Sequence, residues 1–500
     1  MAYKWRYELR KGIEVIQTKQ GRALLSNHPL RLFPINGKAC ELMEASAQKL
    51  SLEELITKHQ ELPPAKIISF MDSLVQKGLL NRVYNPTLNA TDVPQVSVIV
   101  PVRNRAEDIQ QCLESILNCH YPQDKVEIIV VDDGSTDHTK EVIKQYPVQL
   151  IVMEQNVGQS RCRNVGVAAA KADLIAFTDS DCIVDKHWLN ILTEPFADPS
   201  VGIVGGGVSS HGTDKVLDRY EQACSPLHMG EQGGPIGPQQ QIPYIPTCNV
   251  LIRKKAFQLV GGFSEEMRVG EDVDLIWRIL QNQYTGFYLP EGSIQHRHRN
   301  QLHSLMLRRA QYASSEAILE KQFNFNRKKL FISPWHLINL IIFLGLYFGS
   351  AQIIGQQWQA YAPTLVACCG ISMLFSLCSE IMVKKLKLQR LGLEISIKNL
   401  LKPIWRSHLA FLGYITAIIA RYYSIYLMLL SLVFPALLGL LLLVFLVSAY
   451  FDYTVKKPML NYPTFLLVYM IEKLAYQLGV IYGCFKYKNI TPMFHWVKFI

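Results

Sequence analysis

The sequence has few charged residues, and two long stretches have none. Asp, Glu, Lys and Arg make up 18% of the 500 residues, against about 25% in a typical soluble domain. None of the four occurs between Leu330 and Ser379 or between Tyr422 and Phe451. Each stretch is longer than the roughly 20 apolar residues that cross a bilayer as a helix. This argues against a disordered chain and a wholly soluble one, and predicts a soluble part followed by a membrane region.

The membrane region is expected to cover residues 331–500 and to contain about four transmembrane helices. Candidate spans are Phe331–Gly355, Pro363–Val383, Leu409–Tyr426, Leu427–Tyr450 and Thr464–Phe485. The last of these contains Glu472 and Lys473. Because charges facing lipid are costly, both are expected at the membrane interface or packed against protein.

Two further signals are missing. Met1–Arg10 is polar and basic with no apolar segment behind it, so no signal peptide is expected. The 11 cysteines are scattered and contain no Cys-x-x-Cys pair, which argues against a disulfide framework or a structural zinc site. A reduced, cytoplasmic setting fits best.

The net charge of +10 is concentrated beside the apolar stretches. The segment from Lys384 to Arg406 contains seven basic residues and one acidic residue, Glu394. Basic loops beside membrane spans stay in the cytoplasm and attract anionic lipid. The charge therefore predicts membrane lipid, not nucleic acid, as a partner, although a merely solvated face is the alternative. We expect a multi-pass protein of the cytoplasmic membrane whose soluble part faces the cytoplasm.

Residues 1–88 are expected to form a small α+β domain. Strands are predicted at Glu14–Gln17 and Arg22–Leu25, and a helix at Lys38–Leu50. Ser51 and Glu54 form a capping box that opens the next helix, and a third helix follows Pro63 and Pro64. No catalytic constellation is present here. Residues 89–95, in a stretch rich in Pro, Thr and Asn, are predicted to be a linker.

Residues 96–330 alternate between strand and helix patterns. Val96–Pro101 is almost continuously apolar, as a strand covered on both faces should be. Further strands are predicted at Val126–Asp132, Gln149–Met153 and Asp173–Thr178, with helical patterns between them. This alternation is typical of a mainly parallel, Rossmann-like α/β sheet, which binds its ligand outside the carboxyl ends of the strands.

Acidic clusters lie at those strand ends. Asp132 and Asp133 end one strand and precede a glycine turn, where a carboxylate can accept from a nucleobase N–H or a ribose hydroxyl. Asp179 and Asp181 are alternate residues and can share one ligand, which suits Mg²⁺ or Mn²⁺ on a diphosphate. Helix capping by neighbouring residues is the structural alternative for the first cluster.

Gly270-Glu271-Asp272 is the third cluster and begins an amphipathic helix. Acidic residues in a first turn can simply complement the helix dipole. Elsewhere, Gly205–Gly207 lacks the Lys-Ser/Thr of a phosphate loop, and we expect it to let the backbone approach a sugar or an acceptor.

Together these motifs resemble the inverting nucleotide-sugar glycosyltransferases of family 2, which have the GT-A fold. The matching segments are Ser97–Val102, Val131–Ser135, Asn156–Gly158, Arg163–Gly166, Asp179–Asp181, Gly261–Phe263 and Gly270–Asp272. The resemblance implies a nucleoside pocket lined by Pro101, Arg103, Asp132, Asp133 and Arg163. It also implies that Asp179 and Asp181 carry the metal and diphosphate, that Asp272 is the general base, and that Glu271 helps to position it.

The segment Gln295–Arg299 follows, and a His in this region of related enzymes can reach the metal or the diphosphate. We therefore expect His296 as a metal ligand, with His298 on the same side if the segment is extended. Arg297 and Arg299 are alternatives as phosphate ligands, and a solvated basic turn is equally compatible. Arg309 is followed by Ala310, so the Gln-x-x-Arg-Trp motif of processive synthases is missing.

The layout of the whole chain is similar to that of the mycofactocin-system glycosyltransferases. Residues 1–88, ending in Gly78-Leu79-Leu80, resemble the winged-helix-like peptide-binding domain of pyrroloquinoline quinone biosynthesis; a purely structural winged helix is the alternative. The resemblance implies transfer of a hexose, glucose by this likeness, from a UDP-sugar to a peptide-derived redox cofactor. The alternative is a membrane glycosyltransferase for lipid-linked sugars or cell-surface polysaccharide, and a non-catalytic peptide-binding scaffold is a third possibility.

Overall fold

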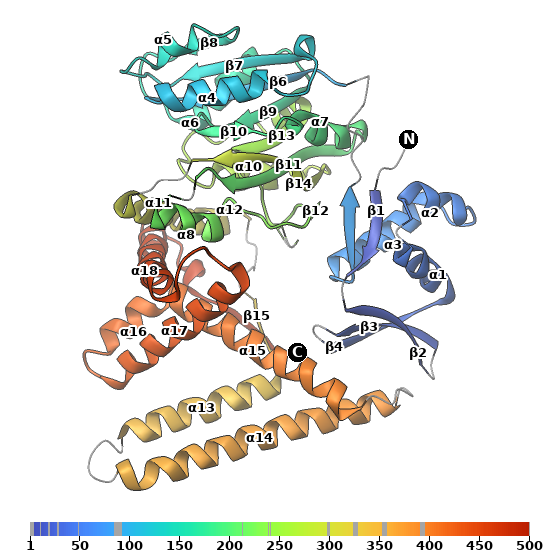
Figure 1. Ribbon diagram of the computed structural model, residues 1–500, viewed down its shortest axis with the longest axis vertical. Helices are drawn as coiled ribbons and strands as arrows, with labels where there is room; N and C mark the ends of the chain where they lie inside the picture. Colours follow the sequence, from blue (N-terminus) through green and yellow to red (C-terminus); the bar gives the residue numbers. More distant parts are fainter. Residues whose placement is uncertain are drawn as a thin grey trace.

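The computed structural model describes residues 5–10, 12–18, 21–27, 30–48, 50–84, 93–212, 214–238, 240, 242–297, 301–323, 329–352, 358–390 and 396–499. Three parts follow one another along the chain: a small N-terminal α+β part, a large sheet covered by helices, and a group of long helices (Figure 1). Most of the predicted linker, residues 89–92, lies outside the described residues.

The N-terminal part contains two small sheets and three helices. Strands β2 (Ile13–Thr18), β3 (Gly21–Asn27) and β4 (Leu30–Ile35) form an antiparallel sheet, and β1 (Trp5–Leu9) pairs with β5 (Leu80–Tyr84). The helices are α1 (Gly37–Ala47), α2 (Leu52–Lys58) and α3 (Pro64–Gln76).

The Ser51–Glu54 capping box is confirmed. The Ser51 side chain accepts from the Glu54 backbone N–H, and the Glu54 carboxylate accepts in return from the Ser51 N–H at 2.7 Å. These two hydrogen bonds satisfy amide groups that have no partner within the helix. The predicted strands and helices are thus present, and β1, β4 and β5 are additional.

The central sheet has nine strands, in the order β10-β14-β11-β13-β9-β6-β7-β8, with β12 paired to β14. Its first half follows the predicted pattern: β6 (Val96–Val102), β7 (Val126–Asp132), β8 (Gln149–Val152) and β9 (Leu174–Thr178) are parallel. All seven residues of β6 are buried, as the apolar run predicted.

The second half of the sheet is mixed, so "mainly parallel" holds only for the first half. The pair β11 (Val201–Ser210) and β14 (Thr285–His296) is parallel, but β13 (Asn249–Arg253) runs antiparallel to both β11 and β9. The short strands β10 (Cys182–Val184) and β12 (Gly234–Pro235) are antiparallel to β14. The prediction missed this reversal because it used only the strand–helix alternation of residues 96–178. A parallel half that continues into a mixed, curled half is the GT-A arrangement.

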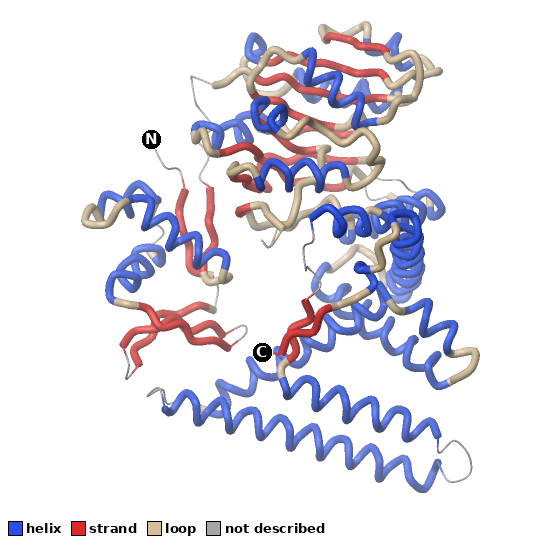
Figure 2. The backbone as a smooth tube through the Cα atoms, turned by 180° about the vertical axis from the view of Figure 1, so that it is seen from behind, coloured by secondary structure: helices blue, strands red, loops and turns tan. Residues whose placement is uncertain are grey.

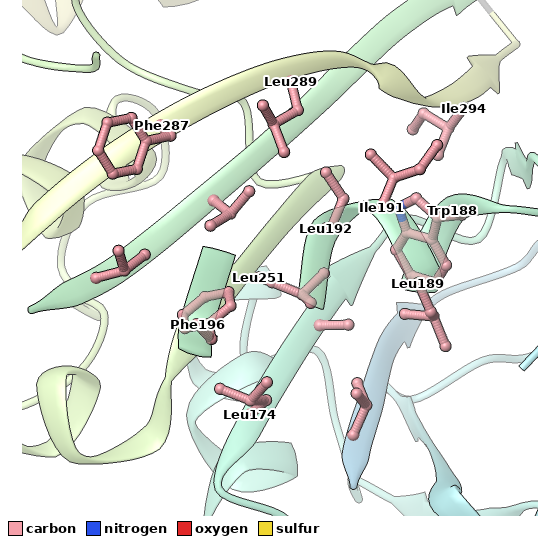
Figure 3. Close-up of a cluster of buried hydrophobic side chains, with 14 of the residues drawn as sticks. Leu174, Trp188, Leu189, Ile191, Leu192, Phe196, Leu251, Phe287, Leu289 and Ile294 are labelled. Atoms are coloured by element: carbon pink, nitrogen blue, oxygen red, sulfur yellow. The ribbon is translucent and has the colours of Figure 1, made fainter. Parts of the chain in front are cut away.

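Helices cover the sheet. They are α4 (Ala106–Leu117), α5 (Thr139–Ile143), α6 (Gln159–Ala169), α7 (Trp188–Thr193), α8 (Val216–Cys224), α9 (Lys254–Leu259), α10 (Glu271–Gln281), α11 (Leu302–Ser314) and α12 (Glu316–Phe323). On one side of the sheet the α7 side chains Trp188, Leu189 and Leu192 pack on Leu251 and Leu289 (Figure 3). The Trp188 indole N–H also donates to Asn249 at 2.7 Å, which satisfies the polar atom of this buried ring.

The triple glycine Gly205–Gly207 lies in β11, where it allows the neighbouring backbone to pack closely. A Cβ on Gly206 would meet the Gly292 carbonyl oxygen at 1.9 Å, and one on Gly207 would meet the Pro290 oxygen at 2.5 Å. No side chain fits between these backbones. The expectation that the segment approaches a sugar or an acceptor is therefore wrong: its close neighbour is strand β14.

The C-terminal part consists of long helices and one strand pair. The helices are α13 (Pro334–Gln352), α14 (Trp358–Arg390), α15 (Ile397–Tyr422), α16 (Ser424–Leu430), α17 (Ala436–Lys456) and α18 (Tyr462–Tyr487). Strand β15 (Lys329–Ile332), which leads into α13, pairs in parallel with β16 (Trp496–Phe499). In Figures 1 and 2, α18 lies directly beside α11 of the sheet-bearing part.

Two helices of the described chain are long and apolar enough to cross a membrane, α17 and α18. The pair α15 and α16, bent by 73°, adds a third candidate if it counts as one broken span. These helices indicate membrane association, while the number of four spans stays a prediction. Glu472 of α18 is only 6% exposed and packs against protein, as predicted.

Candidate active site

A cavity of about 1460 Å³ opens where β6, β7 and β9 end. It exceeds the roughly 300–1000 Å³ of a site for one small ligand, so it has room for a donor and an acceptor side by side. Its walls are formed by residues at the strand ends, by α11 and by the C-terminal helix α18. The predicted site residues that line it are Pro101, Arg103, Asp133, Asp179, Asp181 and His296.

The two aspartates after β7 have different surroundings. Asp133 lines the cavity, and one carboxylate oxygen accepts from the Val157 N–H at 2.6 Å. Asp132 is fully buried behind the wall and accepts from the Ser135 N–H at 3.1 Å. Asp132 therefore holds the turn that presents Asp133, and only Asp133 faces the space where a nucleoside would lie.

Arg163 of α6 was predicted to line the nucleoside pocket, but the structure places it among the carboxylates. Its side chain is 1% exposed, and its guanidinium lies 2.7 Å from Asp179 Oδ1 and 3.3 Å from Glu271 Oε1. Burial alone would lower the pKa of Arg163, but Asp179 and Glu271 outweigh burial and raise it. Arg163 thus stays charged and joins the end of β9 to the start of α10.

Asp181 and His296 form the part of the site that could hold a metal ion. His296 Nε2 lies 3.5 Å from Asp181 Oδ1, and the Arg105 guanidinium lies 3.7 Å from Asp181 Oδ2. Burial raises the pKa of Asp181, although His296 and Arg105 oppose the shift.

The donor set fits a divalent cation. Asp181, Cys182 and His296 have ligand atoms within 4.8 Å of one another. Burial raises the pKa of the Cys182 thiol well above its usual range, so it stays protonated and leaves a carboxylate and an imidazole as ligands. That combination suits Mn²⁺ and also accepts Mg²⁺. Asp179 is not part of this cluster, and its Oδ1 accepts from Arg163 at 2.7 Å.

Glu271 and Asp272 begin α10, as predicted. Gly270 precedes them with a φ of 81°, the left-handed conformation that glycine adopts without strain. Burial, together with the neighbouring Glu271, raises the pKa of Asp272 to about 7, and burial also raises that of Glu271. Asp272 is therefore tuned to the range in which a general base works at neutral pH.

Neither Glu271 nor Asp272 is among the residues that line the cavity. Glu271 is connected to it by Gln159, whose side-chain amide donates at 2.5 Å, and by Arg163. Asp272 lies within the electrostatic reach of Tyr312, which does line the cavity.

Several lining residues were not found from the sequence. Arg308 and Tyr312 of α11 face the cavity, as do Leu478, Tyr482 and Lys486 of α18. No motif marks the α18 residues, since their place beside the site depends on folding across more than 150 residues. His298 and Arg299, also considered as ligands, lie outside the described residues.

Comparison with known proteins identifies the domain that contains this site. Residues 97–261 match the family model described as "Glycosyl transferase family 2". This segment is a family 2 glycosyltransferase domain. The match begins at β6 and includes Asp132, Asp133, Arg163, Asp179 and Asp181, while Glu271 and Asp272 follow it within ten residues or so.

Curated relatives agree with the glycosyltransferase assignment. A "Pre-mycofactocin glycosyltransferase" of Mycobacterium tuberculosis (strain H37Rv) is 33% identical over 252 residues, which is 49% of this chain and 52% of the relative. "Glycosyltransferase AglE" of Haloferax volcanii is 31% identical over 202 residues, which is 39% of this chain and 64% of the relative. The chain thus spans about half to two thirds of the length of these relatives.

Among solved structures, a mannosyltransferase from Pyrobaculum calidifontis in complex with GDP-Man and Mn²⁺ is similar to this chain. The two are 19% identical, with a TM-score of 0.39, and the match covers 58% of this chain and 89% of that structure.

Proposed function

We propose that the protein is an inverting, metal-dependent glycosyltransferase that moves a hexose from a UDP-sugar to a hydroxyl acceptor. The observation that supports this most is Arg163, which ties Asp179 and Glu271 together inside the family 2 domain. The bridge brings a diphosphate-side carboxylate and the general-base segment to one point. In the proposed reaction the acceptor hydroxyl attacks the anomeric carbon opposite the leaving diphosphate, and a single displacement inverts its configuration.

Separate groups of residues would bind the donor, deprotonate the acceptor and hold the cation. Asp133, with Pro101 and Arg103, would hold the nucleoside at the ends of β6 and β7. Asp272 would remove the proton from the acceptor hydroxyl, with Glu271 fixed beside it by Arg163 and Gln159. Asp181 and His296 would hold a divalent cation, with Asp179 contributing the carboxylate oxygen that does not accept from Arg163. When bound, the cation would supply charge stabilisation for the departing diphosphate.

We propose a peptide-derived redox cofactor of the pre-mycofactocin type as the acceptor. The 33% identity to the mycobacterial pre-mycofactocin enzyme supports it. We further propose that residues 1–88 are a winged-helix-like peptide-recognition domain and that residues 96–330 are the catalytic domain. Residues 331–500 would anchor this domain in the membrane with about four spans. The catalytic domain would face the cytoplasm, because the basic 384–406 segment would stay on that side.

A lipid-linked acceptor is the second candidate, and one observation favours it. Leu478, Tyr482 and Lys486 line the same cavity as Asp133, Asp179 and Asp181, and they belong to a helix apolar enough to cross a membrane. An acceptor with an apolar chain could therefore lie along α18 while its head group enters the cavity.

The test is acceptor-dependent release of UDP by detergent-purified full-length protein with Mn²⁺ or Mg²⁺. Pre-mycofactocin and a polyprenyl phosphate are the two acceptors, and mass spectrometry identifies the product. A hexose added to pre-mycofactocin supports the first acceptor, and transfer only to the lipid supports the second. Asp272→Asn should abolish transfer and keep nucleotide binding, whereas Glu141→Gln, an exposed carboxylate on α5, should change neither. Full turnover by Asp272→Asn would refute its role as base.

A further inference from the structure

Helix α11 has two neighbouring arginines, Arg308 and Arg309, with different partners. Arg308 lines the cavity, and Glu271 and Asp179 are among the groups that raise its pKa against the effect of burial. Its guanidinium also lies over the Tyr312 ring, 4.8 Å from the centroid. Arg309 also lies at the cavity wall, but it is only 3% exposed, and its guanidinium pairs with buried carboxylates of α8 and α18. The position of Arg308 in the wall beside Asp179 therefore depends on how α11 is held through Arg309.

A buried polar network holds Arg309 in place. Arg309 forms ion pairs with Glu221 of α8 and with Glu472 of α18, the latter at 3.1 Å between Nε and Oε1. The Tyr220 hydroxyl also donates to Glu472. Glu472 is 6% exposed and Glu221 4%. The network thus connects the catalytic domain to a helix that lies 163 residues further along the chain.

The two carboxylates that pair with Arg309 differ in their surroundings. Burial raises the pKa of Glu221 to about 7, although Arg309 opposes the shift. This shift favours the neutral form of Glu221, which would weaken its pairing with Arg309. Lys473 Nζ also lies 3.4 Å from Glu472, so Glu472 joins two cations and a hydroxyl.

The backbones of α11 and α18 meet beside this network. A Cβ on Gly479 would lie 2.1 Å from the Ala310 carbonyl oxygen, and one on Gly483 would lie 2.3 Å from the Ser314 oxygen. In both helices the two residues are four apart and so share one face. Small residues at this spacing allow helices to approach closely, as in membrane helix pairs. The contact fixes the separation of α11 and α18, and the ion pair fixes their register.

We propose that Glu472 is a positioning residue for glycosyl transfer: through Arg309 it holds α11 so that Arg308 and Tyr312 face the catalytic carboxylates. The candidate membrane helix α18 would then help to position active-site residues as well as anchor the protein. This inference rests on the proposed function for the reaction that it serves. The nucleoside end of the cavity, at Pro101, Arg103 and Asp133, belongs to other elements and should not depend on Glu472.

The experiment compares Glu472→Gln with the wild type in the full-length, detergent-purified protein. Hydrolysis of UDP-glucose in Mn²⁺, with water as acceptor, needs no knowledge of the natural acceptor. We expect kcat to fall at least about tenfold while the Kd for UDP stays within about twofold. Hydrogen exchange should increase in residues 302–314 and stay unchanged in 271–281. The matched control is Glu380→Gln, a buried carboxylate of α14 that pairs with Lys384 and His408 and does not contact α11.

A double variant tests the route of the effect. If Glu472 acts through Arg309, adding Arg309→Gln to Glu472→Gln should lower kcat no further than the more severe single variant does. Tyr220→Phe, which removes only the hydroxyl that donates to Glu472, should give a smaller change in the same direction and covers the case in which Glu472→Gln does not fold.

Three outcomes overturn the inference: an unchanged kcat in folded Glu472→Gln, a parallel loss of UDP binding, or fully additive effects of the two substitutions. A wild-type protein that binds UDP but turns over no sugar nucleotide would instead overturn the proposed function. In that case increased hydrogen exchange of 302–314 still decides whether Glu472 fixes α11.

Discussion

Arg163 donates to Asp179 at 2.7 Å while another nitrogen of its guanidinium lies 3.3 Å from Glu271, so one buried cation joins two carboxylates from separate segments of the chain. Asp179 follows β9 and Glu271 opens α10. Without the cation, these two charges and that of Asp272 would face one another in a poorly solvated space. The arrangement makes Arg163 the central structural residue of the site.

Arg163→Lys should therefore be nearly inactive. A lysine ammonium is a single point charge and cannot bridge both carboxylates as a planar guanidinium does. Loss of a buried pair costs about 3–5 kcal/mol, so thermal stability should fall together with a drop in kcat of about 100-fold or more. Kinetics and a melting curve measure both effects.

The control is Arg161→Lys, two residues away on α6. Arg161 is more than half exposed, and its contact to Glu265 is 3.9 Å long. Exposed pairs of this kind contribute roughly 0–1 kcal/mol, so this variant should resemble the wild type. Wild-type rates in Arg163→Lys would show that the bridge is dispensable.

The pH dependence of transfer should reflect Asp272. Burial and Glu271 raise its pKa to about 7, and only the deprotonated carboxylate can accept the acceptor proton. The rate should therefore fall about tenfold per pH unit below that value and level off above it. A pH–rate profile of kcat, measured with saturating donor, checks this, and a profile that stays flat down to pH 5 would contradict it.

Stability gives an independent check on the same group. A carboxyl whose pKa is raised by folding stabilises the folded state below its unfolded pKa of about 4, and this contribution is lost as pH rises through about 7. Asp272→Asn removes the buried charge and should melt higher than the wild type at pH 8, with a smaller gain at pH 5. Equal gains at both values would mean that Asp272 is not the titrating group.

His296→Ala should weaken metal binding. The imidazole lies 3.5 Å from Asp181, and we expect the loss of one ligand to raise the Kd for Mn²⁺ by about 10–100-fold. Electron paramagnetic resonance of free Mn²⁺ measures this without any turnover. His303→Ala, an exposed histidine on α11, is the matched control, and identical Mn²⁺ titrations of the two variants would exclude His296 as a ligand.

Removal of residues 1–88 should weaken binding of the acceptor and leave the use of the donor unchanged. If this part recognises a peptide-derived acceptor, its loss should raise the acceptor KM by about tenfold or more, equivalent to about 1.4 kcal/mol. UDP-glucose hydrolysis by the same protein should be unchanged, because the described cavity lining contains no residue from this part. An unchanged acceptor KM would remove the peptide-recognition role.

The sequence predicted the features that depend on neighbours in the chain. The Ser51–Glu54 capping box, the buried β6 run and the carboxylates at the ends of β7 and β9 were all readable from local pattern. Features that join distant segments of the chain could not be predicted in this way. Arg163 belongs to a motif in the sequence, but only the fold shows that it faces Asp179 and Glu271 instead of a nucleoside.

The same reason explains the other differences. Glycines in β11 carry no sign of which backbone approaches them, and Gly206 meets β14 more than 80 residues later. The reversal of β13 within the sheet has no local signal either, since an apolar strand looks alike in both directions. The pairing of Arg309 with Glu472 is likewise invisible until α11 and α18 lie together.

The close fit of α11 to α18 has a consequence for how the protein can be divided. A truncated protein ending at Phe323 would keep every residue of the family 2 match, yet it would expose the strip around Ala310 and Ser314 that Gly479 and Gly483 cover. It would also remove Glu472, one of the two carboxylates that pair with Arg309. The hydropathy boundary near residue 330 is therefore no boundary of folding, and a water-soluble fragment cut there should aggregate or lose α11 order.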